Sequence, residues 1–362
     1  GLQAARPRPL PPPCRDASVG RRHVAQYRPP HVSRTHAPRV CASPRLVVAM
    51  TTKSMPYRLE DCPSWELRRC RRGAAVAAWT IQGHSVAGER TGFHIPELRL
   101  GLDAGMPTYR TLTNILMSHS HSDHSFFVPC IAMGPAPMPK RPLILAPAEA
   151  MAPLDLLTRA SESLNCCTTL WEGPVINSMG VRPGDEVELK AGKSGKQAVV
   201  VRVVECQHSV PCVGFIVCSV AHKLKDAYRG LSGKEIGAAR KRGEDVQERV
   251  VVPQVAFMGD TTAAVFDTHP EVLDVPVVMV ECTGVGDMEP AVARERGHAH
   301  WRDLAPYVIS HPETTFILMH FSLSRKDDGL REYFADEAKA APNRLANVVV
   351  WLDSGGLELA SL

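Results

Sequence analysis

Four side chains of the kind that bind metals lie within six residues of one another, and these are His119, His121, Asp123 and His124. They follow an apolar run at residues 115–117, which is typical of a buried strand. One histidine near a protein core can be satisfied by a backbone partner, but three histidines and an aspartate at this spacing need another explanation. Because imidazole and carboxylate groups are common zinc ligands, the pattern predicts a metal site.

A zinc ion takes about four ligands, and six consecutive residues rarely supply all of them to one ion. His119 and His121 can point toward one ion. After the chain bends, Asp123 and His124 can face a second ion. Each ion then needs further ligands from downstream segments, and three candidates stand at the ends of apolar runs, namely His208, Asp260 and His320.

The recurrence of such residues at strand ends decides between two interpretations. Taken alone, a histidine after a strand is more often a satisfied core residue, and Asp260 before the segment TTAAVF could cap a helix. Four strand ends, however, each carry a metal-type ligand, and open α/β folds place their sites at the carboxyl ends of strands. We therefore expect these side chains to share one cleft.

The elements that must position these side chains begin near residue 74. Short β-rich runs recur from there to residue 352, and stretches with helical character lie between them at residues 147–164, 232–243, 288–309 and 327–341. Strands separated by helices predict an α/β fold in which two sheets are covered by helices. We expect residues 74–362 to form one catalytic domain and residues 1–73 to form a leader.

The leader is rich in proline and arginine and has no hydrophobic period, so we expect it to be disordered or to act in targeting. Residues 1–50 contain nine arginines, no lysine and one acid, whereas the rest of the chain carries 33 basic and 37 acidic groups. This composition resembles an organellar transit peptide, which predicts delivery to a chloroplast or mitochondrion. The alternative is that the chain starts at Met50 and acts in the cytoplasm or nucleus.

Cysteine content and hydropathy indicate where in the cell the protein acts. The 11 cysteines are odd in number and scattered, which predicts reduced thiols and an intracellular protein. No apolar stretch approaches the length of about 18 residues that a membrane span requires, so we expect no membrane partner.

The motif HSHSDH, followed in order by His208, Asp260 and His320, resembles the metallo-β-lactamase superfamily. The sequence between these residues is similar to the ribonuclease Z branch, the tRNA 3′-processing endoribonucleases, and especially to the short form of plants and algae. The similarity is densest in the segments KLKDAYRGLSGKEIGAARKRGEDVQERVVVPQVAFMGDTT, VMVECT, GHAHW and ILMHFS. It implies an αββα four-layer sandwich, two zinc ions per chain and a homodimer.

The resemblance assigns the metal ligands to two sets. The first zinc ion would be bound by His119, His121 and His208. The second zinc ion would be bound by Asp123, His124 and His320. Asp260 would bridge the two ions, and Asp103, in the segment LGLDAG, would support the ligands from outside.

The resemblance also implies which residues act in catalysis. Asp123 would orient the attacking water. Glu281 would keep His298 protonated near neutral pH, so that His298 can donate a proton to the departing oxygen. His222 and His300 match no ligand position, and we interpret both as ordinary surface or packing residues.

The reaction implied by the resemblance is removal of the 3′ trailer from precursor tRNA, by phosphodiester hydrolysis after the discriminator nucleotide. A basic arm or insertion at residues 222–250 would grip the RNA backbone through salt-dependent contacts. The candidate RNA-binding residues are Lys223, Lys225, Arg229, Lys234, Arg240, Lys241 and Arg242. A solvated helix face is the alternative interpretation of this charge run.

Two other functions stay open. The ligands of the superfamily do not fix the substrate, so a dinuclear metallohydrolase of a small thioester, lactam or phosphodiester is the alternative enzyme. Glu281, His298 and the basic arm favour the endoribonuclease. A scaffold protein that keeps the fold without the activity is the third function, and the presence of every expected ligand argues against it.

Overall fold

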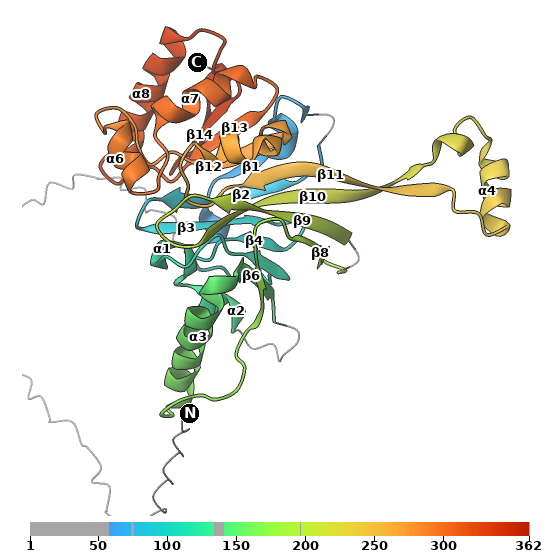
Figure 1. Ribbon diagram of the computed structural model, residues 1–362, viewed down its shortest axis with the longest axis horizontal. Helices are drawn as coiled ribbons and strands as arrows, with labels where there is room; N and C mark the ends of the chain where they lie inside the picture. Colours follow the sequence, from blue (N-terminus) through green and yellow to red (C-terminus); the bar gives the residue numbers. More distant parts are fainter. Residues whose placement is uncertain (1–57, 74–75, 134–140, 196, 362) are drawn as a thin grey trace, which may run out of the picture. The chain divides into compact units, whose positions relative to one another are not determined.

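The computed structural model describes residues 58–73, 76–133, 141–195 and 197–361, which belong to one compact unit, Lys53–Leu362. Residues 1–57 lie outside the described part of the chain, so the predicted disorder or targeting role of the leader stays a prediction. Within the described part, the strands form a seven-stranded sheet and an eight-stranded sheet (Figure 1).

The seven-stranded sheet contains the first seven strands in chain order, with β4 to β7 parallel to one another. These strands are β1 (Ser64–Glu66), β2 (Thr80–Val86), β3 (Arg90–Ile95), β4 (Leu100–Leu102), β5 (Asn114–Leu116), β6 (Leu143–Pro147) and β7 (Asn177–Val181).

The eight-stranded sheet contains the remaining strands, and β11 to β14 are parallel within it. Its members are β8 (Glu186–Ala191), β9 (Gln197–Cys206), β10 (Cys212–Leu224), β11 (Gln247–Phe257), β12 (Val277–Glu281), β13 (Thr315–Met319), β14 (Val348–Leu352) and β15 (Gly355–Glu358).

The helices connect these strands, and none in the described ranges is long and apolar enough to span a membrane. They are α1 (Ser122–Ser125), α2 (Val128–Ala132), α3 (Met151–Cys166), α4 (Gly233–Lys241), α5 (Val265–Thr268), α6 (Pro290–Glu295), α7 (Trp301–Ser310) and α8 (Asp327–Ala340). Each stretch predicted to be helical overlaps at least one of them, and α3 and α7 run past the predicted ends at residues 164 and 309.

The central strands are buried on both faces. In β12, Val277 and Met279 pack in the core between the two sheets, while Val278 and Val280 pack against helices on the outer face. Side chains alternate along a strand, so a parallel strand with two covered faces needs an unbroken apolar run. The run VVMV in β12 meets this requirement.

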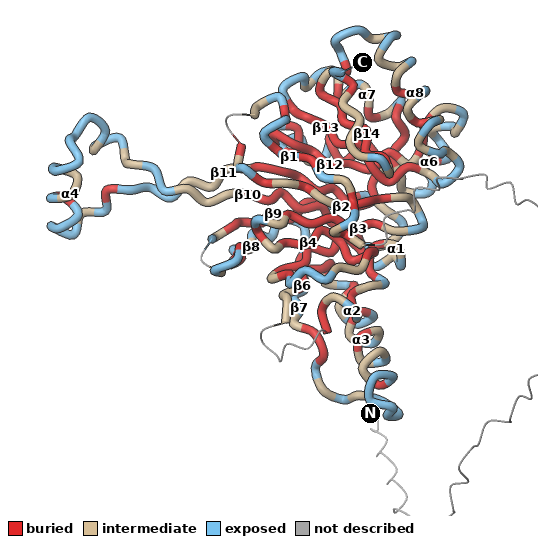
Figure 2. Tube along the Cα trace, turned by 180° about the vertical axis from the view of Figure 1, so that it is seen from behind, coloured by how far each residue is buried: buried red, intermediate tan, exposed pale blue. Residues whose placement is uncertain are grey.

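Helices cover the outer face of each sheet. On the eight-stranded sheet, α7 and α8 contribute Trp301, Leu304 and Phe334 to the outer core. On the seven-stranded sheet, α2 and α3 contribute Val128 and Leu154. The layers therefore follow the order helix, sheet, sheet, helix, and the buried strands lie at the centre (Figures 1 and 2). The predicted αββα sandwich is confirmed.

The folded unit begins before the predicted boundary at residue 74. Strand β1 pairs with β2, with Trp65 opposite Ile81, and the indole of Trp65 donates a hydrogen bond of 2.8 Å to Glu358. Leu59 and Leu67 are buried on either side. The boundary predicted at residues 73 and 74 therefore falls inside the fold, because a three-residue strand in an arginine-rich segment has too few residues to show a period.

A two-stranded ribbon extends from the eight-stranded sheet. Strands β10 and β11 stay paired out to Leu224 and Gln247, although β9 leaves β10 at Ser219 and β12 reaches β11 only from Val255 onward. Helix α4 lies beyond the end of this ribbon, in the exposed segment at the right of Figure 1 and the left of Figure 2. Residues 222–250 therefore lie in this projecting segment, and their role as a basic arm stays a prediction.

Local chemistry explains why α4 begins where it does. The hydroxyl of Ser232 accepts a hydrogen bond from the backbone N–H of Glu235, and the Glu235 carboxylate accepts one from the backbone N–H of Ser232. Such a capping box satisfies two N–H groups that a helix start otherwise leaves unpaired. The segment LSGKEI thus fixes the start of the helix without help from a core.

Candidate metal centre

The predicted ligands all follow the carboxyl ends of strands. The HSHSDH segment follows β5, which ends at Leu116, and His208 comes two residues after the end of β9. Asp260 follows β11 by three residues, and His320 comes directly after β13. The seven-stranded sheet supplies the first segment and the eight-stranded sheet supplies the others, so the cluster forms where the two sheets meet.

The first group of ligands contains three histidines and one aspartate. The ligand atoms of His119, His121, His208 and Asp260 all lie within 4.8 Å of one another. The Nε2 atoms of His119 and His208 each lie 3.1 Å from Nδ1 of His121. This grouping matches the set predicted for the first ion, with the predicted bridging residue included.

The second group contains Asp123, His124 and His320, whose ligand atoms also lie within 4.8 Å of one another. The Nε2 atoms of His124 and His320 are 3.2 Å apart, and Oδ2 of Asp123 is 3.5 Å from Nε2 of His320. Asp260 faces this group too, at 3.4 Å from His124 and 3.5 Å from His320. One carboxylate thus faces both groups, as expected of a bridging ligand.

In four of the ligand histidines, the ring nitrogen that points away from the cluster contacts a hydrogen-bonding partner. Nδ1 of His208 donates to the backbone oxygen of Gly297 at 2.9 Å, and Nδ1 of His124 donates to Oδ2 of Asp103 at 2.7 Å. Nδ1 of His119 lies 3.0 Å from the hydroxyl of Ser118, and Nδ1 of His320 lies 3.1 Å from that of Thr283.

These outer bonds fix which nitrogen carries the proton. The Ser118 hydroxyl donates to Asp103 and the Thr283 hydroxyl donates to Glu281, so both hydroxyls accept from their histidines. The Nε2 lone pairs of His119, His124, His208 and His320 then all point inward. Lone pairs facing one another at about 3 Å repel unless a cation lies between them, so this donor set fits zinc.

Asp103 ties the ligand segment to its strand. Its buried carboxylate accepts hydrogen bonds from the backbone N–H of Ser118 at 2.6 Å and from the Ser118 hydroxyl at 2.9 Å, in addition to the bond from His124. Asp103 and His320 both adopt left-handed backbone angles, with φ of 59° and 61°. The supporting position predicted for Asp103 agrees with these contacts.

Burial and close charges shift the pKa values of the cluster in opposite directions. Burial alone would lower the pKa of His124, but the carboxylates of Asp260, Asp103 and Asp123 outweigh it and raise that pKa to about 9. Burial lowers the pKa of His119 well below its usual value. Burial opposes the charge of Asp260, yet the surrounding histidines hold its pKa below the usual range. The carboxylates therefore need positive charge beside them, which protons or metal ions can supply.

A carboxylate and an imidazole form a second unit beside the ligands. Glu281 is fully buried at the end of β12, and its Oε1 accepts hydrogen bonds from Nδ1 of His298 at 2.7 Å and from the backbone N–H of Thr261 at 2.9 Å. Its Oε2 accepts from the backbone and hydroxyl of Thr283. Four donors thus occupy the two oxygens of this buried carboxylate. Burial opposes the charge of His298, but Glu281 outweighs it and raises the pKa of His298.

The position of this couple follows from the sheet. Strands β12 and β13 are parallel neighbours, with Glu281 opposite Met319, so Glu281 lies beside the residue that precedes His320. The ring of His298 stacks on that of His320 at 5.8 Å between centroids. Asp260, His298 and His320 also lie close enough to hold an ion, so His298 is a second candidate ligand beside Asp260 and His320. His298 thus lies next to Glu281, at 2.7 Å between Nδ1 and Oε1.

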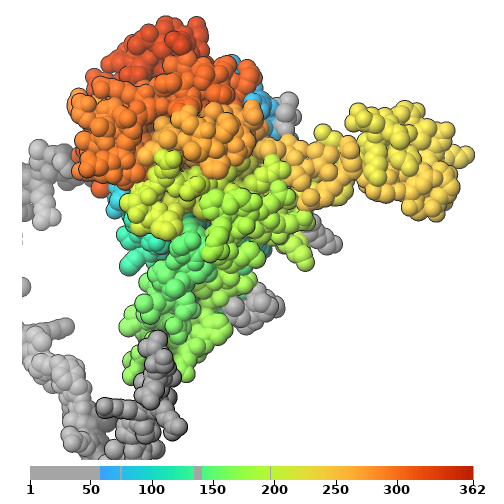
Figure 3. Space-filling view, viewed as in Figure 1, coloured from blue at the N-terminus to red at the C-terminus, as the bar shows by residue number. Residues whose placement is uncertain are grey.

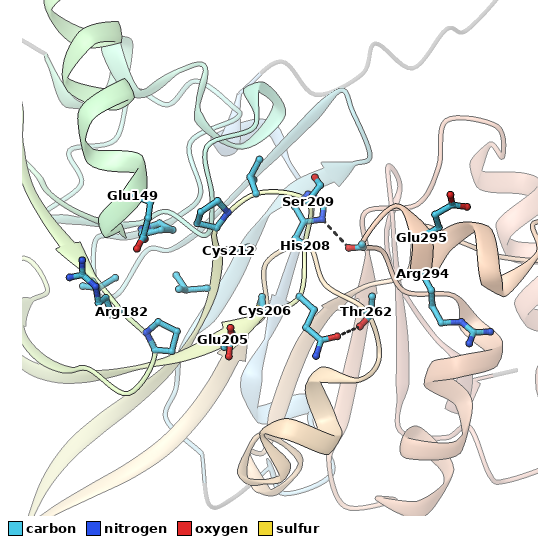
Figure 4. Close-up of a pocket in the computed structure, with 18 residues that line it drawn as sticks. Glu149, Arg182, Glu205, Cys206, His208, Ser209, Cys212, Thr262, Arg294 and Glu295 are labelled. Atoms are coloured by element: carbon cyan, nitrogen blue, oxygen red, sulfur yellow. Dashed lines mark hydrogen bonds between the residues drawn. The ribbon is translucent and has the colours of Figure 1, made fainter.

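An open cavity of about 820 Å³ adjoins His208. Figure 4 shows His208 on the loop between β9 and β10, with Arg182 and Glu149 on one side and Arg294 and Glu295 on the other. A dashed line joins His208 to the backbone oxygen of Gly297. The cavity therefore gives solvent access to the side of the cluster on which His208 lies.

Sequence reasoning missed two residues of the site, Ser118 and Thr283. Each links a ligand histidine to a buried carboxylate. Their signal is position, since Ser118 directly precedes the HSHSDH motif and Thr283 ends the VECT segment. His300 is buried and caps α7 by accepting from the backbone N–H of Arg302, and His222 is exposed on the ribbon, so neither joins the cluster.

No family model matches the chain, but comparison with known proteins finds relatives. The chain is 28% identical over 258 residues to tRNase Z TRZ1 of Arabidopsis thaliana, covering 70% of this chain and 88% of that protein. It is 26% identical to the chloroplastic tRNase Z TRZ2 of the same plant, covering 72% and 73%. The solved structure of the short form of human tRNase Z matches with 16% identity and a TM-score of 0.41, over 67% of this chain and 91% of that one. The chain is thus similar in sequence to tRNase Z proteins, as its motifs predict.

Proposed function

We propose that this chain is an endoribonuclease that removes the 3′ trailer from precursor tRNA by hydrolysing the phosphodiester bond after the discriminator nucleotide. The observation that carries the proposal is the hydrogen-bonded couple of Glu281 and His298 beside a cluster of seven metal-type ligands. A second support for this function is sequence similarity, since the chain resembles a tRNase Z protein along 70% of its length.

The cluster would hold two zinc ions, the first by His119, His121 and His208 and the second by Asp123, His124 and His320, with Asp260 between them. When bound, these ions would supply a nucleophile at neutral pH and neutralise charge on the phosphate. The orientation of the histidine lone pairs supports both sets. Asp123 would hold and orient the attacking water, and its own Oδ2 is held by the backbone N–H of Gly88 at 2.9 Å.

His298 would act as the general acid. Its Nδ1 donates to Glu281, and the side chain is 19% exposed, so Nε2 is the nitrogen left to face a substrate. A histidine with a raised pKa stays protonated to higher pH, which is the state that a proton donor needs. The departing 3′-oxygen of RNA is a poor leaving group unless it receives this proton.

The arm would bind the body of the RNA, and the structure separates its cations into two sets. Lys225, Arg229 and Arg242 form ion pairs with Asp245, Asp226 and Glu244. No ion pair within the described residues engages the other four predicted residues, which are Lys223, Lys234, Arg240 and Lys241. Because unpaired cations attract phosphate more strongly, we assign the RNA contact to this second set. Three of them lie on α4, on the yellow surface of Figure 3.

A homodimer would form through α3. Ala152, Leu156, Ala160 and Leu164 follow one another at intervals of four residues and are all exposed. Leu156 and Leu164 expose 59% and 83% of their surface, which is costly for leucine in water. A ridge that alternates small and large side chains can interdigitate with a second copy of itself about a two-fold axis. We therefore propose a second copy of this chain as the partner of the ridge.

Delivery to an organelle is proposed from the leader's composition together with the name of one relative, the chloroplastic tRNase Z TRZ2. The chain with a C-terminal fluorescent tag should enter chloroplasts, and immunoblotting should show loss of roughly the first 50 residues, which precede the buried Leu59 and strand β1, as expected of a removed transit peptide. A diffuse signal from the cytosol and nucleus would contradict the proposal.

The deciding experiment compares three substrates with the same zinc-loaded protein: a synthetic precursor tRNA with a 3′ trailer, a bis-aryl phosphodiester and a small thioester. We expect cleavage after the discriminator nucleotide, with a 3′-hydroxyl on the tRNA and a 5′-phosphate on the trailer, and loss of cleavage with a chelator. Mature tRNA is the matched control substrate and should stay intact. Rapid thioester hydrolysis without cleavage of the precursor would instead establish the small-substrate hydrolase.

A further inference from the structure

Two cysteines stand on either side of the loop that carries His208. Cys206 is the last residue of β9, and Cys212 is the first residue of β10. The two residues lie directly opposite each other in the antiparallel ladder. Both thiols are free and both side chains are almost fully buried. The proposed hydrolysis uses neither of them.

The register of the strands suits a disulfide. Residues directly opposite in an antiparallel pair have Cα atoms about 4.5–5.5 Å apart, inside the range of about 4.4–6.8 Å found in disulfides. Opposite residues also place their side chains on the same face of the sheet. The ladder therefore sets the two thiols side by side on one face of the sheet. Cys218 on the same strand faces Val200 instead and offers a matched control.

A small oxidant can reach these thiols. Cys206 and Cys212 both line the cavity of about 820 Å³ beside His208, and Figure 4 shows the three residues around the same opening. Because both thiols are almost fully buried, the reaction should be slow. An oxidant reaches Cys206 and Cys212 only through this cavity, whereas the thiols of Cys130, Cys166 and Cys167 are exposed.

We propose that Cys206 and Cys212 are a redox modification site, and that a disulfide between them weakens the metal centre. The two thiols lose two protons and two electrons as the sulfur–sulfur bond forms. A small-molecule disulfide such as oxidised glutathione takes up the two protons and the two electrons, and its own sulfur–sulfur bond breaks to give two thiols. The effect on zinc concerns the ligand cluster alone, whereas the effect on RNA cleavage rests on the proposed function.

The packing around Cys212 transmits the change to both ligand loops. A Cβ atom placed on Gly259 would lie 2.7 Å from the sulfur of Cys212, so this sulfur packs tightly against the residue before Asp260. A disulfide brings the two sulfurs to about 2.05 Å, which requires one sulfur or its backbone to move. Protein interiors have little free volume, so His208 or Asp260 shifts with it. A misplacement of about 1 Å can lower turnover by about 100-fold.

The test uses the full chain, incubated for hours at pH 8 with oxidised or reduced glutathione. Peptide mass mapping should find a link between Cys206 and Cys212 only after oxidation. Zinc affinity, measured by competition with a chromogenic chelator, should fall by about 10- to 100-fold, as should cleavage of precursor tRNA, and dithiothreitol should restore both. Cys218→Ser should respond as the unchanged chain does, whereas Cys212→Ser should keep its zinc affinity in both buffers.

Each contrary result has a defined meaning. If the exposed cysteines are oxidised and no link joins Cys206 to Cys212, the proposal is wrong. It is equally wrong if the link forms and zinc affinity does not change. Cys206→Ser provides a second variant in case Cys212→Ser does not fold. If zinc affinity responds to oxidation but the chain never cleaves RNA, the redox proposal stands and only the proposed function is refuted.

Discussion

Replacement of His298 by alanine gives the sharpest test of the proposed chemistry. The substitution removes the imidazole that Glu281 holds at 2.7 Å but leaves all seven predicted ligands in place. A positioned general acid contributes roughly 10²- to 10⁴-fold to turnover, which corresponds to about 3–5 kcal/mol of activation free energy. We therefore expect His298→Ala to slow cleavage of precursor tRNA by that factor, while two zinc ions per chain stay bound.

The assay separates proton donation from other roles by changing the leaving group. Nitrophenolate departs with little help from an acid, so hydrolysis of a nitrophenyl phosphodiester should slow by less than about 10-fold in the same variant. The pH profile gives a second readout. Because Glu281 raises the pKa of His298, the protonated form persists to higher pH, and activity should fall only as pH rises through that raised value. This alkaline fall should disappear in His298→Ala.

The control is another histidine that pairs with a glutamate. His269 lies 3.1 Å from Glu271, outside the ligand cluster, and His269→Ala should leave turnover within about twofold on both substrates. Equal slowing of both substrates by His298→Ala would refute the acid role and identify the pair as structural. Loss of one zinc ion would instead identify His298 as a ligand, as its closeness to Asp260 and His320 allows.

Three further predictions concern the bridge, the arm and the dimer. Asp260→Ala should reduce zinc below two per chain by elemental analysis and lower turnover by at least about 100-fold, and full activity would remove Asp260 from the site. Lys234, Arg240 and Lys241 are the three unpaired cations of α4, and replacing them by alanine should raise the Michaelis constant for precursor tRNA. The slope of log affinity against log salt concentration should become less steep by about two to three. The same change at the ion-paired Lys225 and Arg229 should have a smaller effect, and equal effects would contradict the division into two sets. Leu156→Asp combined with Leu164→Asp should convert a dimer to a monomer in analytical ultracentrifugation, and a chain that is already monomeric at micromolar concentration would refute the α3 interface.

The convergence of the ligands was predictable because it follows from a simple geometric rule. A strand buried on both faces appears as an apolar run, and the residue after that run lies at the edge of the sheet. His320 obeys this rule directly after the fully buried β13, whereas His208 and Asp260 follow the partly buried β9 and β11 by two and three residues. The rule does not depend on where the strands sit in the sheet, so the sequence reveals the cleft before the topology is known.

Other features were not predictable because they depend on partners far away in the chain. Trp65 is buried against Ile81, and its indole bonds to Glu358, which is 293 residues away. A sequence likewise lists the cations of the arm without showing which acids neutralise them, and Arg249 is paired with Glu188 across 61 positions. Ser118 and Thr283 escaped notice for a different reason, since small hydroxyl residues are common and have no period.

The left-handed backbone at Asp103 and His320 sets a limit on how stable this protein can become. Residues other than glycine lose roughly 1 kcal/mol or more in this conformation, and neither position can change to glycine without losing a side chain of the cluster. The surrounding sheets therefore have to supply stability in excess of what folding alone requires. Selection for thermal stability without selection for activity would relax these two positions first, and the metal centre would be lost while the sandwich persisted.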